Sequence, residues 1–124
     1  MNRAIAVAVG GALGAVLRYH LQNWTFGRWG AGFPYGTLLI NISGAFFIGM
    51  VMTVLLEHLH ISPIWRVFLV TGILGGFTTF SALTWEAYAL CMEGKALLGA
   101  LYVGGSLLGG MLALLLGVFF GRMI

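Results

Sequence analysis

Four long apolar segments, at residues 4–23, 36–56, 64–92 and 96–120, occupy most of the sequence. Both prolines lie between these segments, and most of the charged residues lie between them or at the two ends of the chain. A helix needs about 20 apolar residues to cross the hydrocarbon of a bilayer. Only 7% of the residues are charged, whereas soluble domains carry about a quarter. We therefore predict an all-α membrane protein, a single domain of four transmembrane helices over residues 1–124.

The charged and sulfur-containing residues exclude several other classes. The six basic residues are scattered, so they form no stripe of the kind that binds nucleic acid, and they favour contact with lipid headgroups. Cys91 is the single cysteine, so no intrachain disulfide forms. Residues 1–17 resemble a signal peptide but run into Arg18 without a cleavage motif, so we interpret them as part of a retained first span.

The third apolar segment, with 29 residues between positions 64 and 92, is longer than one crossing requires. Gly72, Gly75, Gly76 and the threonines that follow them lie near its middle, and glycine weakens a helix. Non-helical backbone at membrane depth is tolerated only in protein or beside a wet cavity. We predict that the third helix is broken at Gly75 and Gly76, at a functional centre.

The basic residues are balanced between the two sides of a four-span chain. They are Arg3, Arg66 and Arg122 on one side, and Arg18, Arg28 and Lys95 on the other. The rule that sets membrane orientation needs an asymmetry of basic residues. Its absence here would allow insertion in both directions and an antiparallel dimer, and the alternative is a scatter of few charges that carries no information on orientation. Glycines four residues apart, at 10 and 14, 72 and 76, and 105 and 109, favour close helix association.

Polar side chains inside the spans indicate either a pathway or a bundle interior. They are Asn41 in the second span, Thr78, Thr79, Ser81 and Thr84 in the third, and Tyr102 and Ser106 in the fourth. No carboxylate lies at the centre, and such donors suit an anion better than a cation. Asn41 could instead bind a neighbouring helix, and the pair in the fourth span could serve helix packing.

Two charged residues are expected near the membrane surface. Glu86 lies six residues beyond Phe80, near an interface or vestibule. Arg18 lies toward the same side, where it attracts anions or reaches a headgroup. His20, His58 and His60 lack further metal ligands at the right spacing, and no serine has a placed histidine and acid. We therefore expect no enzyme.

The sequence resembles the bacterial fluoride channels, the Fluc or CrcB family. The resemblance covers essentially the whole chain, and its most specific motif is GILGGFTTFS at residues 72–81, followed by Glu86. Three further motifs match, namely Gly11-x-x-Gly14-x-x-x-Arg18, Gly36-Thr37-x-x-x-Asn41-x-x-Gly44 and Tyr102-x-x-x-Ser106.

This resemblance implies a dual-topology antiparallel homodimer in the bacterial inner membrane, with two pores that export cytoplasmic fluoride passively. It also implies a structural sodium ion at the dimer centre, held by the main-chain carbonyls of Gly75 and Thr78. The implied pore residues are Asn41, Thr79, Phe80, Ser81, Leu83, Tyr102 and Ser106, and Arg18 and Glu86 belong to the vestibules.

Leu83 departs from the family pattern, which usually has a second phenylalanine at this position. A leucine has no ring edge, so a homodimer would have one-ring pores or a complementary subunit would be needed. A small multidrug exporter shares the four spans and the antiparallel dimer but needs a carboxylate within the first span, which has none. A packing subunit of a larger complex would leave residues 78–81 and Asn41 unexplained.

Overall fold

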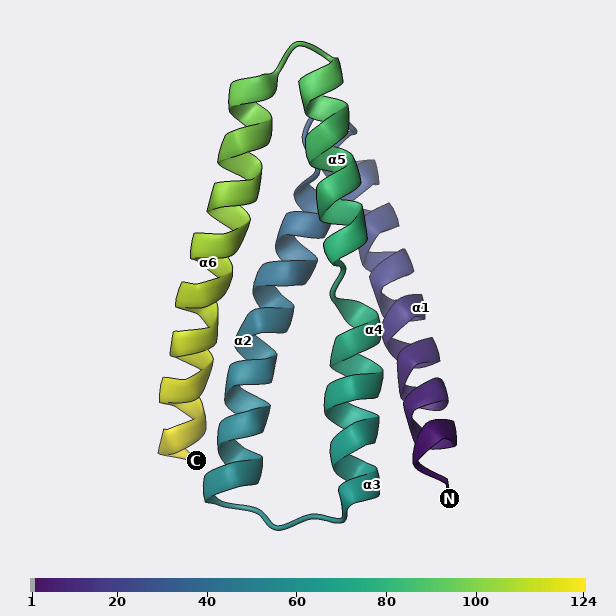
Figure 1. Ribbon diagram of the computed structural model, residues 1–124, viewed down its shortest axis with the longest axis vertical. Helices are drawn as coiled ribbons and strands as arrows, with labels where there is room; N and C mark the ends of the chain where they lie inside the picture. Colours follow the sequence, from purple (N-terminus) through teal and green to yellow (C-terminus); the bar gives the residue numbers. More distant parts are fainter. Residues whose placement is uncertain (1) are drawn as a thin grey trace.

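The computed structural model describes residues 2–124 as helices joined by short connections (Figure 1). The elements are α1 (Arg3–Trp29), α2 (Tyr35–Glu57), α3 (Pro63–Arg66), the π-helix η1 (Val67–Leu74), α4 (Gly75–Phe77), α5 (Phe80–Met92) and α6 (Ala96–Met123). In the described residues, four segments are long and apolar enough to cross a membrane, namely α1, α2, the run from α3 to α5 (Pro63–Met92), and α6. The all-α prediction with four spans is confirmed.

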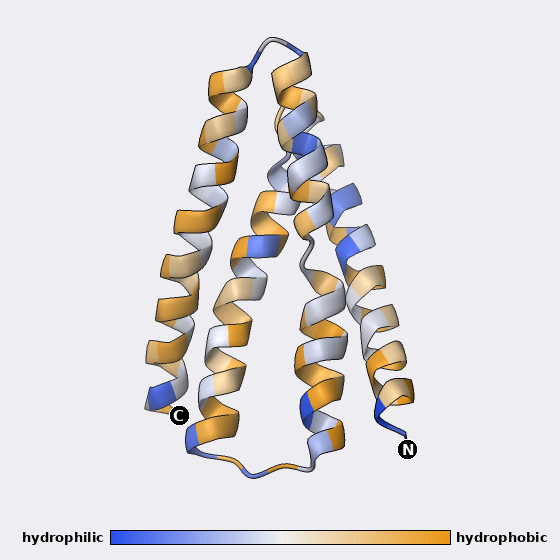
Figure 2. Ribbon diagram, viewed as in Figure 1, coloured by the Kyte–Doolittle hydropathy of each residue, from blue (hydrophilic) through white to orange (hydrophobic). Residues whose placement is uncertain are grey.

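Most residues along these helices are hydrophobic (Figure 2), and many of the large apolar side chains are exposed. Both termini and the α2–α3 connection lie at one end, and the α1–α2 and α5–α6 connections lie at the other (Figure 1). No more than 28% of the residues in the apolar window of any span are buried within this chain. The remaining apolar surface is suited to lipid or to further protein, as expected of a multi-pass membrane protein.

The first half of the third span packs closely against α1 through glycines. A β-carbon on Gly72 would lie 2.9 Å from the Cα of Gly10, and one on Gly76 would lie 2.6 Å from the Gly11 carbonyl oxygen. Such close approach is what small residues permit between membrane helices. The predicted glycine motifs of the first and third spans therefore face each other.

The second and fourth spans form another close pair. A β-carbon on Gly49 of α2 would collide with the carbonyl oxygen of Leu114, and one on Gly117 of α6 would collide with that of Phe46. Only one glycine of the predicted motif at 105 and 109 makes a close contact within the chain. Gly109 faces Ile42 of α2, whereas a β-carbon on Gly105 would meet nothing within 4 Å.

The third span is broken, as predicted, but at a different place. Thr78 and Thr79 are extended, with φ −80° and ψ 156°, and φ −148° and ψ 117°, respectively. The predicted position at Gly75 and Gly76 is wrong, because these glycines begin α4. Gly76 serves the contact with α1 instead. Beyond the break the span changes its packing partner, since α5 packs mainly against α6.

The first span is longer than predicted. We expected it to end at residue 23 with a loop over 24–35, but α1 continues to its end at Trp29. The Arg28 guanidinium lies 5.1 Å from the centre of the Trp24 ring, one turn earlier, a contact that supports the added turn. Gly30 follows as the C-cap, and its φ of +74° suits glycine at a helix C-terminus.

Candidate functional site at the break of the third span

Asn41 holds the extended backbone of the break. Its Nδ2 donates to the Thr79 carbonyl oxygen at 2.9 Å, and its Oδ1 accepts from the Thr79 N–H at 2.8 Å. Asn41 thus binds a neighbouring span, which was one of its two expected roles. A carboxamide nitrogen carries two hydrogens, so one donor of Asn41 remains for a ligand.

The break frees the two carbonyl groups that the family resemblance implies as sodium ligands. In a continuous helix each N–H bonds to the carbonyl four residues earlier. The Thr79 N–H would bond to Gly75 but bonds to Asn41, and the Ala82 N–H would bond to Thr78 but bonds to Thr79 Oγ1 at 3.2 Å. The carbonyls of Gly75 and Thr78 therefore lose their helical partners because side chains have taken the N–H groups.

The break also creates two new helix ends inside the span. The end before the break presents carbonyls, and Arg18 Nε of α1 donates to the Gly76 carbonyl oxygen at 3.2 Å. A positive charge at a helix C-terminus is stabilising. The end after the break begins α5, and its first N–H groups favour an anion. Arg18, predicted for a vestibule, therefore contacts the carbonyl side of the break.

Most of the predicted pore residues line one cavity of about 350 Å³ at the break. The pore residues that line it are Asn41, Thr79, Phe80, Leu83 and Ser106, and the two expected sodium ligands, Gly75 and Thr78, line it as well. Its lining contains no charged side chain. The Phe80 ring is 74% exposed, whereas Leu83 is 5% exposed and packs into a cluster with Leu90 and Tyr102. Phe80 is therefore an exposed residue of the cavity wall, whereas Leu83 is a buried one.

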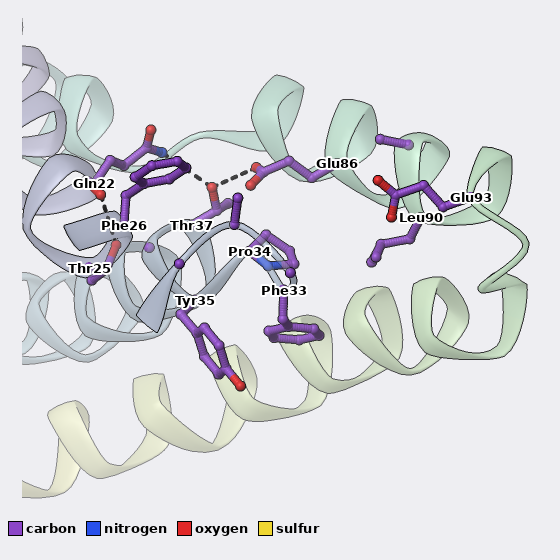
Figure 3. Close-up of a pocket in the computed structure, with 15 residues that line it drawn as sticks. Gln22, Thr25, Phe26, Phe33, Pro34, Tyr35, Thr37, Glu86, Leu90 and Glu93 are labelled. Carbon is purple, nitrogen blue, oxygen red and sulfur yellow. Dashed lines mark hydrogen bonds between the residues drawn. The ribbon is translucent and has the colours of Figure 1, made fainter. Parts of the chain in front are cut away.

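A second set of polar side chains joins three spans (Figure 3). Thr37 of α2 donates to Glu86 Oε1 of α5 at 2.6 Å and accepts from Gln22 Nε2 of α1 at 3.2 Å. These three residues line a separate cavity of about 220 Å³ under the α1–α2 connection. Glu86 thus lies in a hollow near one end of the protein.

Two buried hydroxyl groups lie one turn apart on α6. Tyr102 is 2% exposed and Ser106 is 7% exposed. Among the side chains of residues 2–124, these two hydroxyls are the buried polar groups that make no hydrogen bond of standard geometry, and the Tyr102 hydroxyl lies beside the Thr37–Glu86 pair. An unpaired buried hydroxyl is costly, so each of these groups needs an explanation. Ser81, the remaining predicted pore residue, is exposed and lies 3.4 Å from Thr79 through their hydroxyl oxygens.

Sequence reasoning missed two residues of this region. Gln22 lies one turn after Arg18 in α1, and its polar character inside a span is a signal that could have found it. Phe33 lies in the α1–α2 connection, and its ring packs edge-on against Tyr102 with centroids 5.4 Å apart. No local pattern distinguishes this phenylalanine from the other eight in the sequence.

Comparisons with known proteins identify the family of this chain. Residues 5–118 match the family model described as CrcB-like protein, Camphor Resistance (CrcB). The chain is 47% identical over 120 residues to a protein of Roseiflexus sp. (strain RS-1), with 97% of each chain covered. It is 46% identical over 121 residues to a protein of Thermus thermophilus, covering 98% of this chain and 94% of the other. A Chloroflexus aurantiacus relative is 43% identical over 122 residues, covering 98% and 97%.

These three relatives carry the same name, "Fluoride-specific ion channel FluC". The family match covers nearly the whole length of the chain. The predicted resemblance is therefore confirmed, and the chain belongs to the CrcB family, whose curated relatives are named as ion channels and not as enzymes.

Proposed function

We propose that this chain forms a fluoride-selective channel in the bacterial inner membrane, through which cytoplasmic fluoride leaves passively. Fluoride is proposed as the ion because the relatives of this chain are named fluoride-specific ion channels. The chemistry of the break supports an anion, because the polar part of the mostly apolar cavity lining consists of amide and hydroxyl groups and no charged side chain lines it. A cation pathway would favour acidic side chains or rings of carbonyls along the pore.

The observation that carries the proposal is the pair of buried, unpaired hydroxyls of Tyr102 and Ser106. An O–H group is a donor that rotates toward its acceptor. A fluoride ion passing these hydroxyls would accept the hydrogen bonds that they lack within the chain. Ser106 also lines the cavity at the break, so the two hydroxyls extend the donor set of that cavity along α6.

The remaining pore residues have complementary roles in this proposal. The free N–H of Asn41 donates to the ion at the pore mouth, and Thr79 and Ser81 add hydroxyls at the start of α5. The exposed ring of Phe80 offers its electropositive edge, and Leu83 forms the apolar wall. The N-terminus of α5 adds a favourable field for an anion, as half-helix ends do in transporters.

A structural sodium ion fits the carbonyl side of the break. The carbonyls of Gly75 and Thr78 are the ones freed from the helix ladder, and unwound carbonyls are suitable oxygen ligands for sodium. These two groups would hold the ion at the dimer centre, where its charge would fix the two breaks relative to each other. The neighbouring Gly76 carbonyl oxygen already accepts a hydrogen bond from Arg18.

The proposed assembly is an antiparallel homodimer with dual topology and two pores. Four spans with this little burial enclose no complete pathway alone, and the balanced basic residues favour both orientations. Leu83 gives one specific reason for an alternative. If a second ring is essential to each pore, this chain would be the partner-requiring subunit of a heteromer.

Fluoride efflux from vesicles containing the purified protein tests the function. Fluoride is expected to leave without a proton gradient, while chloride stays inside. A fluoride flux no faster than that from empty vesicles would overturn the homodimeric channel. Flux that returns only with a phenylalanine-bearing family member would support the heteromer. Flux that requires a proton gradient would instead indicate a coupled exporter.

A further inference from the structure

The last turns of α1 carry aromatic rings and an arginine, and the row of rings continues into the start of α2. The rings of Trp24 and Trp29 lie 5.6 Å apart, centroid to centroid, at an interplanar angle of 79°. The Trp29 ring lies 5.6 Å from that of Tyr35, the first residue of α2. The Arg28 guanidinium lies over the Trp24 ring, 5.1 Å from its centre. We call these four residues the Trp–Arg cluster.

The Trp–Arg cluster is exposed and its cation is unpaired. The three aromatic residues are 44–52% exposed, and Arg28 is exposed as well. Within residues 2–124, Arg28 has no ion-pair partner. Its contact with Trp24 uses the face of the indole ring and no hydrogen-bond acceptor. A guanidinium has five N–H donors, and this contact leaves them available for an oxyanion.

The length of α1 places the Trp–Arg cluster beyond the hydrocarbon of a bilayer. The 27 residues of α1 span about 40 Å at about 1.5 Å per residue, whereas the hydrocarbon is about 30 Å thick. The α5–α6 connection carries the exposed ion pair of Glu93 and Lys95, and it projects past the α1–α2 connection at the same end (Figure 1). The cluster therefore lies between the hydrocarbon and the water, at the level of the headgroups, where tryptophan and tyrosine are enriched.

We propose that the Trp–Arg cluster binds the headgroup of an anionic phospholipid. The Arg28 guanidinium donates to the phosphate, a geometry that its planar fork allows in bidentate form. The Trp24 ring holds the guanidinium in place, and the rings of Trp29 and Tyr35 contact the glycerol and the upper acyl chains. An anionic headgroup is favoured over a zwitterionic one because the latter brings a second positive charge close to Arg28.

A phospholipid accounts for the combination of side chains in the Trp–Arg cluster. A protein partner would have to supply both an acidic group for Arg28 and an apolar cover for the exposed rings. The headgroup layer supplies phosphate and acyl chains together at this depth, and rings with one polar edge suit that layer. The inference does not depend on fluoride conduction, because none of the four residues is a predicted pore residue.

Quenching of tryptophan fluorescence by brominated phospholipids tests this proposal. Trp65→Phe and Trp85→Phe together leave Trp24 and Trp29 as the tryptophans of the chain. The folded protein is placed in vesicles of phosphatidylcholine and phosphatidylglycerol, in which one lipid or the other is brominated near the headgroup. The ratio of the two quenching efficiencies gives the relative affinity of the cluster for the two lipids. Phosphatidylglycerol should bind about fivefold more tightly, which corresponds to ~1 kcal/mol for one basic residue at a membrane surface.

Loss of a charge at two positions of the same end separates a site from a general surface effect. Arg28→Gln should bring the affinity ratio close to one, because the phosphate loses its partner. Lys95→Gln is the matched control, since it removes the same charge from a residue that is already paired with Glu93 at 3.8 Å, and it should leave the ratio unchanged. Trp24→Leu should also lower the ratio, because the guanidinium loses the ring that holds it, while Trp29 still reports the quenching. Circular dichroism verifies that each variant is folded.

The other outcomes overturn the proposal in distinguishable ways. Equal quenching by the two lipids in the starting protein would remove the anionic preference, and equal effects of Arg28→Gln and Lys95→Gln would reduce it to general surface attraction. Quenching by neither lipid would place the Trp–Arg cluster against protein, either a second copy or another partner. Loss of the preference on addition of inorganic phosphate at constant ionic strength would assign Arg28 to a free anion.

Discussion

Asn41 and Thr79, which are 38 positions apart in the sequence, are joined by two hydrogen bonds that run in opposite directions. A side chain from the second span thus replaces the helical partners of one residue in the third span. Extended backbone inside a membrane persists only where its polar groups are satisfied. The break is therefore a property of two spans together, and Asn41 is the residue that makes it stable.

Replacing Asn41 by alanine should destabilise the protein. Both hydrogen bonds to Thr79 would be lost, at a cost of about 1–3 kcal/mol for polar groups left unpaired. Unfolding in detergent, followed by circular dichroism, measures this change. Ser43→Ala is the matched control, because the Ser43 hydroxyl donates only to the Ile40 carbonyl of its own helix. Equal stability of the two variants would contradict the clamp.

Substitution of Gly76 by alanine should loosen the first and third spans. The new β-carbon would lie 2.6 Å from the carbonyl oxygen of Gly11, and this contact is with backbone that cannot rotate away. Overpacking of this kind costs about 1–3 kcal/mol. Gly27→Ala should instead be neutral or stabilising by up to about 1 kcal/mol, since its β-carbon meets nothing within 4 Å. Thermal unfolding of both variants provides the comparison, and equal losses would refute the packing argument.

The spans could be predicted from the sequence because their lengths and apolar composition are set by the bilayer. The position of the break could not, since it depends on which neighbour takes over the freed N–H groups. Glycine propensity favoured Gly75 and Gly76, but Gly76 is needed for contact with Gly11. The threonines could leave the helix because Asn41 binds Thr79. Tertiary contacts overrode local propensity here.

The candidate site was predictable residue by residue but not as an arrangement. Polar residues in apolar spans identified Asn41, Tyr102 and Ser106. The spacing along one helix does not fix its rotation against another, so the contact of Asn41 with Thr79 and that of Gln22 with Thr37 had no signal in the sequence. Phe33 lies in a connection, where periodicity carries no information.

Valine at position 37 should separate the three spans that Thr37 joins. Thr37 is 1% exposed and contacts both Glu86 and Gln22 through its hydroxyl. Valine has a similar shape but no hydroxyl, so both partners lose a bond, at about 1–3 kcal/mol. We expect lower stability together with slower fluoride efflux. Thr53→Val is the control, because the Thr53 hydroxyl bonds only within α2, to Gly49. Unchanged stability and efflux in Thr37→Val would exclude a role for this contact.

Phenylalanine at position 83 should raise the fluoride flux of the homodimer. Leu83 lines the 350 Å³ cavity beside Phe80, so the larger ring has adjoining space and would bring a second electropositive edge to the pore wall. Leu83 also packs with Leu90 and Tyr102, so overpacking could cost up to about 3 kcal/mol.

The matched control separates these two effects of the added ring. Leu90→Phe enlarges the same apolar cluster away from the cavity at the break, so it should lower stability without raising flux. Efflux and unfolding measured on both variants decide the matter. If Leu83→Phe remains folded and dimeric but conducts no faster than wild type, the missing ring does not limit conduction. If the wild-type homodimer also conducts fluoride, Leu83 would then give no reason to expect a partner-requiring subunit.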